Sequence, residues 1–371
     1  MKTAPALFAV LVAALATGLA QERVGWQPLD SGVTVRLRGV STVSRQVAWA
    51  SGEHGTVLRT SDGGTTWQPR PVPGADALDF RDIDASSDRV ASVLSIGPGD
   101  ASRIYRTTDG GAHWTLQFTN HDPKVFLDAM AFADATHGVA VSDSVDGQFV
   151  VLMTADGGAH WARVPAERLP PALAVEGAFA ASGTNVAVRG THIWIGTTAS
   201  RVLHSADAGR TWTVTSTPVA SGKATGIFSI AFRDARHGVV VGGNYTKEAD
   251  AIANVATTED GGATWAGSGT DERRTLAAPK PAGEGGQNAE RRATDGGASL
   301  SGYRSVVAWM RGLGPAGWLA VGPSGADVSI DDGRTWSPAG GDGYDALSVS
   351  PDGQAGFATG ARGRIARVTV R

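Results

Sequence analysis

The feature that most constrains this chain is an eight-residue motif, Ser/Thr-x-Asp-x-Gly-x-x-Trp, which occurs six times in 371 residues. We call this motif the box. Six copies of one pattern indicate a repeated structural unit. The aspartate and tryptophan of the successive boxes are Asp62 and Trp67, Asp109 and Trp114, Asp156 and Trp161, Asp207 and Trp212, Asp260 and Trp265, and Asp331 and Trp336.

The residue types of the box are those of a tight turn at the end of a β-hairpin. The Asp carboxylate can accept hydrogen bonds from backbone N–H groups, Gly supplies a positive φ, and Ser or Thr can add a side-chain hydrogen bond. The Trp ring can bury a large apolar surface against the neighbouring unit, and its indole N–H can donate to a carbonyl. We therefore assign the box residues a structural role. With one carboxylate per unit, they are too far apart for a calcium site or a pair of catalytic acids.

The spacing of the boxes indicates the fold. Successive box tryptophans are 47, 47, 51, 53 and 71 residues apart, and a period of about 45 residues with short alternating strands is typical of a propeller blade. One further unit without a box follows Trp336, and residues 26–28 (Trp-Gln-Pro) repeat residues 67–69. We predict an all-β, seven-bladed β-propeller whose N-terminal strand closes the last blade.

The two ends of the chain and one long interval suggest the domain boundaries. Residues 1–20 combine a basic start, an apolar stretch and small residues before Gln21, which predicts a cleaved signal peptide; an uncleaved membrane anchor is the alternative. Residues 21–371 would form one propeller domain, in which residues 266–301 are an inserted flexible loop, because this Gly-, Ala- and Arg-rich segment cannot bury enough apolar surface. We expect a periplasmic or secreted protein with no integral membrane segment after cleavage.

Composition excludes several classes of function. The chain has no cysteine, so disulfides, thiolate nucleophiles and Cys-based metal sites are absent. Its histidines lack metal-ligand spacing and no Gly-rich phosphate loop precedes a helix, so we expect no metal and no cofactor. A formal charge of −3 does not give the basic surface of a nucleic-acid binder. We expect a monomer.

A second set of residues recurs where each unit opens, as in Leu37-Arg38 and Phe80-Arg81, and its second position is charged in six of seven units. The opening strand of a propeller blade lines the central channel, so these residues would lie at the channel mouth, where ligands bind. The alternative is that the mixed charges pair with one another and close the channel. The candidate partner-binding residues are Arg38, Arg81, Asp128, Glu176, Arg304 and Asp345.

The stretch from Gly52 to Trp67, together with Leu37-Arg-Gly-Val, resembles the photosystem II stability/assembly-factor-like propellers of the BNR/Asp-box superfamily. The likeness runs from Trp26 to Val370. It implies a non-catalytic propeller that binds a client protein through a face with an arginine patch, and we expect a protein or glycan partner here. The residues that match this patch are Arg38, Arg81 and Arg304, while Asp128, Glu176, Phe228 and Asp345 replace arginine in the other units.

The same superfamily includes sialidases, which implies a second function. A glycoside hydrolase acting at the channel mouth would use the three arginines to clamp a carboxylate. The groups available for its chemistry would be Glu176, Asp128, Tyr303 and Tyr344. The Arg-Ile-Pro signature of sialidases is absent, because Gly-Val follows Arg38 and Asp-Ile follows Arg81. The sequence therefore favours a binding protein over an enzyme.

Overall fold

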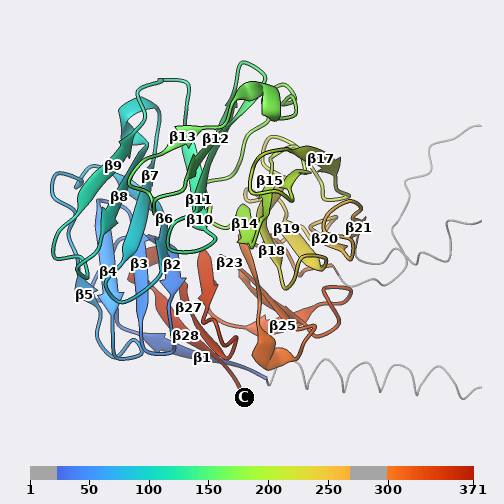
Figure 1. The fold of residues 1–371 in the computed structure, drawn as a ribbon. Helices are drawn as coiled ribbons and strands as arrows, with labels where there is room; N and C mark the ends of the chain where they lie inside the picture. Colours follow the sequence, from blue (N-terminus) through green and yellow to red (C-terminus); the bar gives the residue numbers. More distant parts are fainter. Residues whose placement is uncertain (1–22, 268–298) are drawn as a thin grey trace, which may run out of the picture.

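The computed structural model describes residues 23–267 and 299–371 as seven four-stranded sheets arranged around a central axis (Figure 1). Each sheet is one blade, and we number the blades 1 to 7 from β2. In blades 1 to 6 the strands follow chain order from the axis outward. The prediction of an all-β, seven-bladed propeller is confirmed.

The first four blades span residues 37–216, and their strands are given in order from the axis outward. Blade 1 contains β2 (Leu37–Thr42), β3 (Ala48–Gly52), β4 (Thr56–Thr60) and β5 (Gln68–Pro69). Blade 2 contains β6 (Asp79–Ala85), β7 (Ala91–Ile96), β8 (Arg103–Thr107) and β9 (Thr115–Thr119). Blade 3 contains β10 (Leu127–Phe132), β11 (Gly138–Val145), β12 (Gln148–Thr154) and β13 (Ala162–Arg163). Blade 4 contains β14 (Val186–Arg189), β15 (His192–Gly196), β16 (Arg201–Ser205) and β17 (Thr213–Ser216).

The remaining blades complete the ring. Blade 5 contains β18 (Ile227–Phe232), β19 (Gly238–Gly242), β20 (Val255–Thr258) and β21 (Ala266–Gly267). Blade 6 contains β22 (Val306–Trp309), β23 (Trp318–Gly322), β24 (Gly325–Ser329) and β25 (Ser337–Gly340). Blade 7 contains β26 (Ala346–Val349), β27 (Ala355–Thr359), β28 (Ile365–Val370) and β1 (Val24–Leu29). Short 3-10 turns are η1 (Gly99–Ala101), η2 (Ala166–Arg168), η4 (Arg311–Leu313) and η5 (Ala361–Gly363).

Blade 7 joins the two ends of the chain. Strand β1 pairs antiparallel with β28 from Val24 opposite Val370 to Leu29 opposite Ile365. The indole N–H of Trp26 on β1 donates to the carbonyl of Ala339 in blade 6 at 2.8 Å. The predicted closure by the N-terminal strand is therefore confirmed, and it pairs the first and last strands of the chain with each other.

The second strand of each blade forms the densest part of the core. Strands β3, β19, β23 and β27 are buried along their whole length. Their sequences are nearly continuous apolar runs, such as Gly-Val-Val-Val-Gly in β19, because each lies between the two flanking blades and buries both faces. The outer strands β5 and β13 are exposed.

The box forms the same hydrogen-bonded turn in all six copies. In the first box, Thr60 Oγ1 donates to Asp62 Oδ1 at 2.8 Å and accepts from Gly64 N at 2.9 Å. Asp62 in turn accepts from the backbone N and the hydroxyl of Thr66. These bonds hold the pKa of Asp62 down, to about 2. Gly63 and Gly64 have φ values of 73° and 89°, which explains the glycines of the motif.

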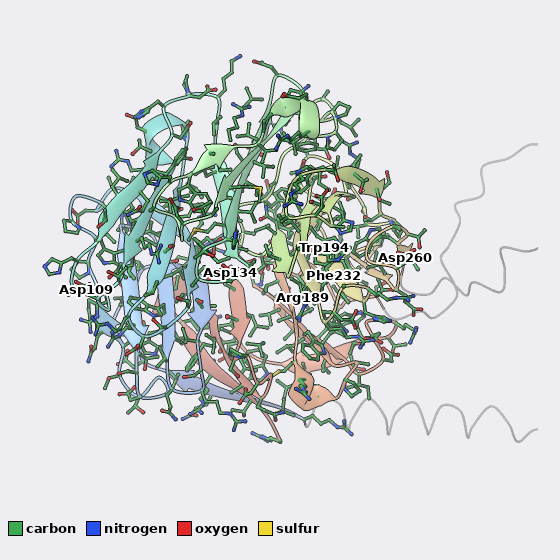
Figure 2. The ribbon with its side chains drawn as sticks, in the orientation of Figure 1. Asp109, Asp134, Arg189, Trp194, Phe232 and Asp260 are labelled. Carbon is green, nitrogen blue, oxygen red and sulfur yellow. The ribbon has the colours of Figure 1, made fainter. Side chains whose placement is uncertain are left out.

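The box turn also joins neighbouring blades. Trp67 packs edge-on against Phe357 of blade 7, with ring centroids 5.6 Å apart, and Trp336 packs in a cluster with the blade 5 strand β19. In the other direction, Arg59 of blade 1 donates to the carbonyl of Gly110 in the next box. Figure 2 shows Asp109 and Asp260 at opposite edges of the molecule. Box carboxylates on different blades thus serve separate turns.

Strand direction separates the two ends of the propeller. The box turns follow the third strand of blades 1 to 6 and lie on one face, which we call the box face. The loops between second and third strands, and the links from one blade to the next, lie on the opposite face. The innermost strands begin there, so we call it the mouth face.

Parts of the predicted boundaries fall outside the described residues, namely the signal peptide (1–20) and residues 268–298. The ends of the predicted insertion belong to the blades. Ala266–Gly267 form β21, which pairs with β20, and Leu300 is buried, with its carbonyl accepting a hydrogen bond from Asn254 Nδ2 at 3.1 Å.

Candidate functional site

A chain segment crosses the mouth of the central channel before blade 4 begins. The strand predicted at Val175-Glu176 instead begins at Val186, as β14. Residues 178–184, which we call the plug, belong to no strand and contact other blades, including a main-chain hydrogen bond from Ile230 N on β18 to the carbonyl of Thr184 at 2.8 Å. Alignment of the repeated units misses this segment because its run of small residues resembles the start of an opening strand.

Arg38 and Arg81 hold the plug from blades 1 and 2. Arg38 Nη2 donates to the carbonyl of Ala181 at 3.0 Å, and Arg81 Nη1 donates to that of Ala180 at 2.8 Å. Arg81 also pairs with Asp79 at 2.7 Å, with about a quarter of each side chain exposed. Two of the three arginines predicted at the mouth, Arg38 and Arg81, therefore bind the same segment, and both donate to main-chain carbonyls.

Arg38 is the less well compensated of the two cations. It is 9% exposed, and among residues 23–267 and 299–371 no carboxylate contacts its guanidinium and its buried Nε has no hydrogen-bond partner. Burial first, and then the nearby Arg81, lower the pKa of Arg38 to about 10. A buried cation whose acceptors are neutral favours an additional negative group beside it.

Blades 5 and 6 hold the other end of the plug. Ser182 Oγ donates to the carbonyl of Ser305 at 2.8 Å, and Thr184 Oγ1 donates to Ser229 Oγ at 2.8 Å. The ring of Phe179 stacks on that of Phe228 at 3.7 Å. The plug thus spans the channel mouth from blades 1 and 2 to blades 5 and 6.

Glu176 anchors the start of the plug. Its side chain is buried, and its carboxylate accepts hydrogen bonds from Thr197 Oγ1 at 2.6 Å, from Leu173 N at 2.8 Å and from the Arg201 guanidinium. Burial raises the pKa of Glu176, but the bonds from Arg201 and Thr197 outweigh it and leave the pKa below its ordinary value. This buried ion pair fixes the turn from which the plug leaves.

Two further predicted residues are held in ion pairs. Arg304 and Asp327 pair at 2.8 Å, and each side chain is at most 2% exposed. Asp345 accepts two hydrogen bonds from Arg36, at 2.7 and 2.8 Å. Arg36 was not predicted, although it lies two residues before Arg38, where strand alternation would place it on the same side.

Asp128 is buried beside a second carboxylate. It is 1% exposed, and its Oδ2 has no hydrogen-bond partner. Burial, followed by the charge of Asp143 on β11, raises the pKa of Asp128 well above its ordinary value. Asp128 is therefore buried near Asp143 and is not exposed for contact with a ligand.

An aromatic cluster lies beside the plug. Tyr303 is 5% exposed, its pKa is raised by burial, and it contacts Phe228 edge-on at 4.7 Å. Tyr245 contacts Phe179 edge-on at 6.3 Å and is the exposed member of the cluster, at 47%. Tyr344 lies elsewhere, stacked on Trp26 at 5.3 Å. Tyr245 and Phe179 have no counterparts in the other units, so the repeat gave no signal for them.

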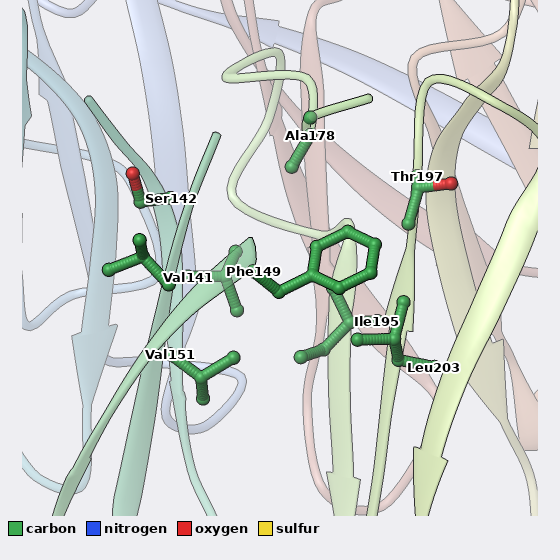
Figure 3. A pocket seen from close by; sticks show the side chains of 10 residues that line it. Val141, Ser142, Phe149, Val151, Ala178, Ile195, Thr197 and Leu203 are labelled. Carbon is green, nitrogen blue, oxygen red and sulfur yellow. The ribbon is translucent and has the colours of Figure 1, made fainter. Parts of the chain in front are cut away.

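A small cavity lies beneath the root of the plug, between blades 3 and 4 (Figure 3). Phe149, Ile195 and Leu203 line it, with Ala178 and Thr197 above them. Its volume, about 10 Å³ of space for a water-sized sphere, has room for a single water molecule. The cavity is therefore too small to hold a ligand larger than water.

Metal-ligand clusters and membrane-spanning helices do not occur in the described part of the chain. In residues 23–267 and 299–371, no three His, Cys, Asp or Glu side chains group together as metal ligands. Over the same two ranges, no helix is long and apolar enough to cross a membrane.

The similarities to known proteins concern the fold. No family model and no curated protein matches the chain. The solved structures that it resembles include YCF48 bound to D1 peptide (16% identity, 93% of this chain and 97% of that chain, TM-score 0.59). YCF48 from Cyanidioschyzon merolae is 17% identical, over 92% of this chain and 98% of that chain, with a TM-score of 0.58. The GH74 xyloglucanase from Xanthomonas campestris is 16% identical, over 92% of this chain and 53% of that chain, with a TM-score of 0.55. All share the propeller.

Proposed function

We propose that the protein is a non-catalytic, assembly-factor-like propeller of the Asp-box type that binds an extended segment of a protein partner at its mouth face. The observation that carries this proposal is the pair Arg38 and Arg81, whose guanidinium groups already hold a non-strand stretch of main chain through two consecutive carbonyls. A site that binds carbonyls of one polypeptide segment is suited to binding another. This supports a protein partner over a glycan.

Exposed apolar side chains support the choice of face. Large apolar residues exposed on a protein surface mark contact sites when they gather. Four of the six such residues in the described part of the chain lie in loops of the mouth face, and they are Leu173, Val175, Tyr245 and Ile252. The predicted signal peptide supports action in the periplasm or outside the cell, and the likeness to a propeller bound to a D1 peptide supports a peptide ligand.

The test uses one arginine on each face. Arg81→Ala removes a partly exposed mouth-face guanidinium without leaving a buried charge, and Arg45→Ala removes an exposed arginine paired with Asp352 on the box face. Each variant and the wild type are immobilised and incubated with the envelope fraction of the source cells. We expect a protein that wild type and Arg45→Ala retain and Arg81→Ala loses. Equal retention by all three would contradict the proposal.

A glycoside hydrolase is the second candidate, and the similarity to the GH74 xyloglucanase is the observation in its favour. Such enzymes need two carboxyl groups beside the glycosidic bond. Here Glu176 and Asp128 are 2% and 1% exposed, and Glu176 is paired with Arg201. Turnover of xyloglucan oligomers or sialosides by the purified protein, lost in Glu176→Gln, would replace the binding proposal with this one.

A further inference from the structure

We propose that the plug is a detachable internal ligand of Arg38 and Arg81, which covers the two guanidinium groups until a partner segment replaces it. The covering itself is independent of any partner. Only the replacement step rests on the proposed function.

The plug is fixed at its ends and weakly held between them. Glu176 fixes one end through Arg201 and Thr197, and at the other end the carbonyl of Asn185 accepts from Gly196 N at 2.8 Å, where β14 begins. Between these points the chain belongs to no strand ladder, and one main-chain hydrogen bond, from Ile230 N to the carbonyl of Thr184 at 2.8 Å, joins it to β18. A segment tied at both ends can leave its seat without loss of the blade that follows.

The composition of the plug gives it little apolar surface to bury. Residues 180–183 read Ala-Ala-Ser-Gly, and Phe179 is the one large side chain in the segment. Phe179 remains partly exposed while it stacks on Phe228. The plug is therefore retained mainly by hydrogen bonds to side chains, which an incoming polar segment can replace one for one.

The arginine donors favour such a replacement. Both guanidinium groups bind neutral carbonyls of the plug, and Arg38 Nε is unpartnered. A charged acceptor binds a guanidinium more strongly than a carbonyl does, and in a bidentate geometry that a single carbonyl cannot offer. A partner segment with an acidic group would therefore displace the plug and leave the ring of blades intact.

The test exposes the arginines by unseating the plug. Gly183 has a φ of 74°, and a Cβ at this position would lie 2.2 Å from Asp82 Oδ1, so Gly183→Ala must displace the plug or the buried Asp82 side chain and strains the backbone at this position. The matched control is Gly190→Ala, which also replaces a glycine with positive φ but meets no atom within 4 Å. Both variants and wild type are treated with phenylglyoxal, and modified arginines are located by mass spectrometry.

We expect Arg38 and Arg81 to react at least about fivefold faster in Gly183→Ala than in wild type or Gly190→Ala, because local opening uncovers them. Exposed Arg45 should react in all three proteins, and buried Arg304 in none. The double variant Ser182→Ala with Thr184→Ala, which removes two plug hydrogen bonds without a clash, should change reactivity in the same direction.

Two results would overturn the proposal. Unchanged reactivity of Arg38 in both plug variants would mean that the plug does not cover it. Reactivity of Arg304 in the plug variants would mean that the plug is part of the folded core and does not detach. No partner is used in these measurements, so neither result bears on the proposed function. A partner retained by wild type should bind Gly183→Ala at least as tightly, and weaker binding would contradict replacement of the plug.

Discussion

The two faces of this propeller differ in how their contacts relate to the repeat. On the box face, six turns use the same residue types in the same hydrogen bonds, from Thr60 with Asp62 to Ser329 with Asp331. On the mouth face, equivalent positions hold Arg38, Asp128 and Phe228, and each makes a different contact. Contacts that recur from blade to blade stabilise the propeller, whereas contacts that occur once are available for binding a partner.

The largest effect should come from removing a box tryptophan. Trp336 is 5% exposed and donates its indole N–H to Gly333 O at 2.9 Å. Truncation of a buried aromatic costs ~3–5 kcal/mol, so Trp336→Ala should lower the free energy of unfolding by that amount in urea titration. Trp114 is more exposed, so Trp114→Ala should lower the free energy of unfolding by less. A loss below about 1 kcal/mol for Trp336→Ala would contradict the structural role of the box.

Two arginines of the mouth face should differ in how far their replacement with Ala destabilises the protein. Arg304→Ala leaves Asp327 as a buried unpaired charge and should destabilise by ~3–5 kcal/mol. Arg81→Ala breaks a partly exposed pair and should cost at most about 1 kcal/mol. Thermal and urea unfolding of the two variants measure the difference. Similar losses for both would remove the distinction between a core arginine and a binding arginine.

Replacing Asp128 should change the free energy of unfolding by less, and it should stabilise the protein. Its folded pKa is raised above the ordinary 3.8 by burial and by Asp143, so the folded state binds the proton more tightly than the unfolded chain. Stability from this group is present at low pH and is lost as pH rises from about 4 through the folded pKa. Asp128→Asn should therefore stabilise at pH 7, by ~1–3 kcal/mol, and flatten this part of the curve of stability against pH. A loss of stability at pH 7 would contradict the assignment.

Replacing a box aspartate should change the free energy of unfolding least, and the change should appear at acid pH. The pKa of Asp62 is lowered to about 2 by hydrogen bonds from Thr66 and Thr60, so its contribution to stability is present above about 4 and is lost as pH falls toward 2. Asp62→Asn should make stability between these pH values less dependent on pH. An acid limb as steep as that of wild type would show that the carboxylate contributes nothing to its turn.

The repeat made most of the fold predictable. Box spacing indicated the blades, and Trp26 indicated the strand that closes blade 7, because these features recur and each copy supports the others. The mouth face was predictable only in part. Arg38 and Arg81 were found from their position in the repeat, but a strand was predicted next to the plug, since aligning units by similarity hides an insertion of small residues. Arg36 and Tyr245 occur once, so no comparison between blades could single them out.

Hydrogen–deuterium exchange of the full chain, free and saturated with the retained partner, tests most directly whether the mouth face is the functional one. The account predicts that bound partner slows amide exchange around Arg81 and in the loop that carries Tyr245, both on the mouth face. Exchange in the box turns around Asp62 and Asp331 should stay the same. Slower exchange confined to the box turns, with no change around Arg81, would contradict it.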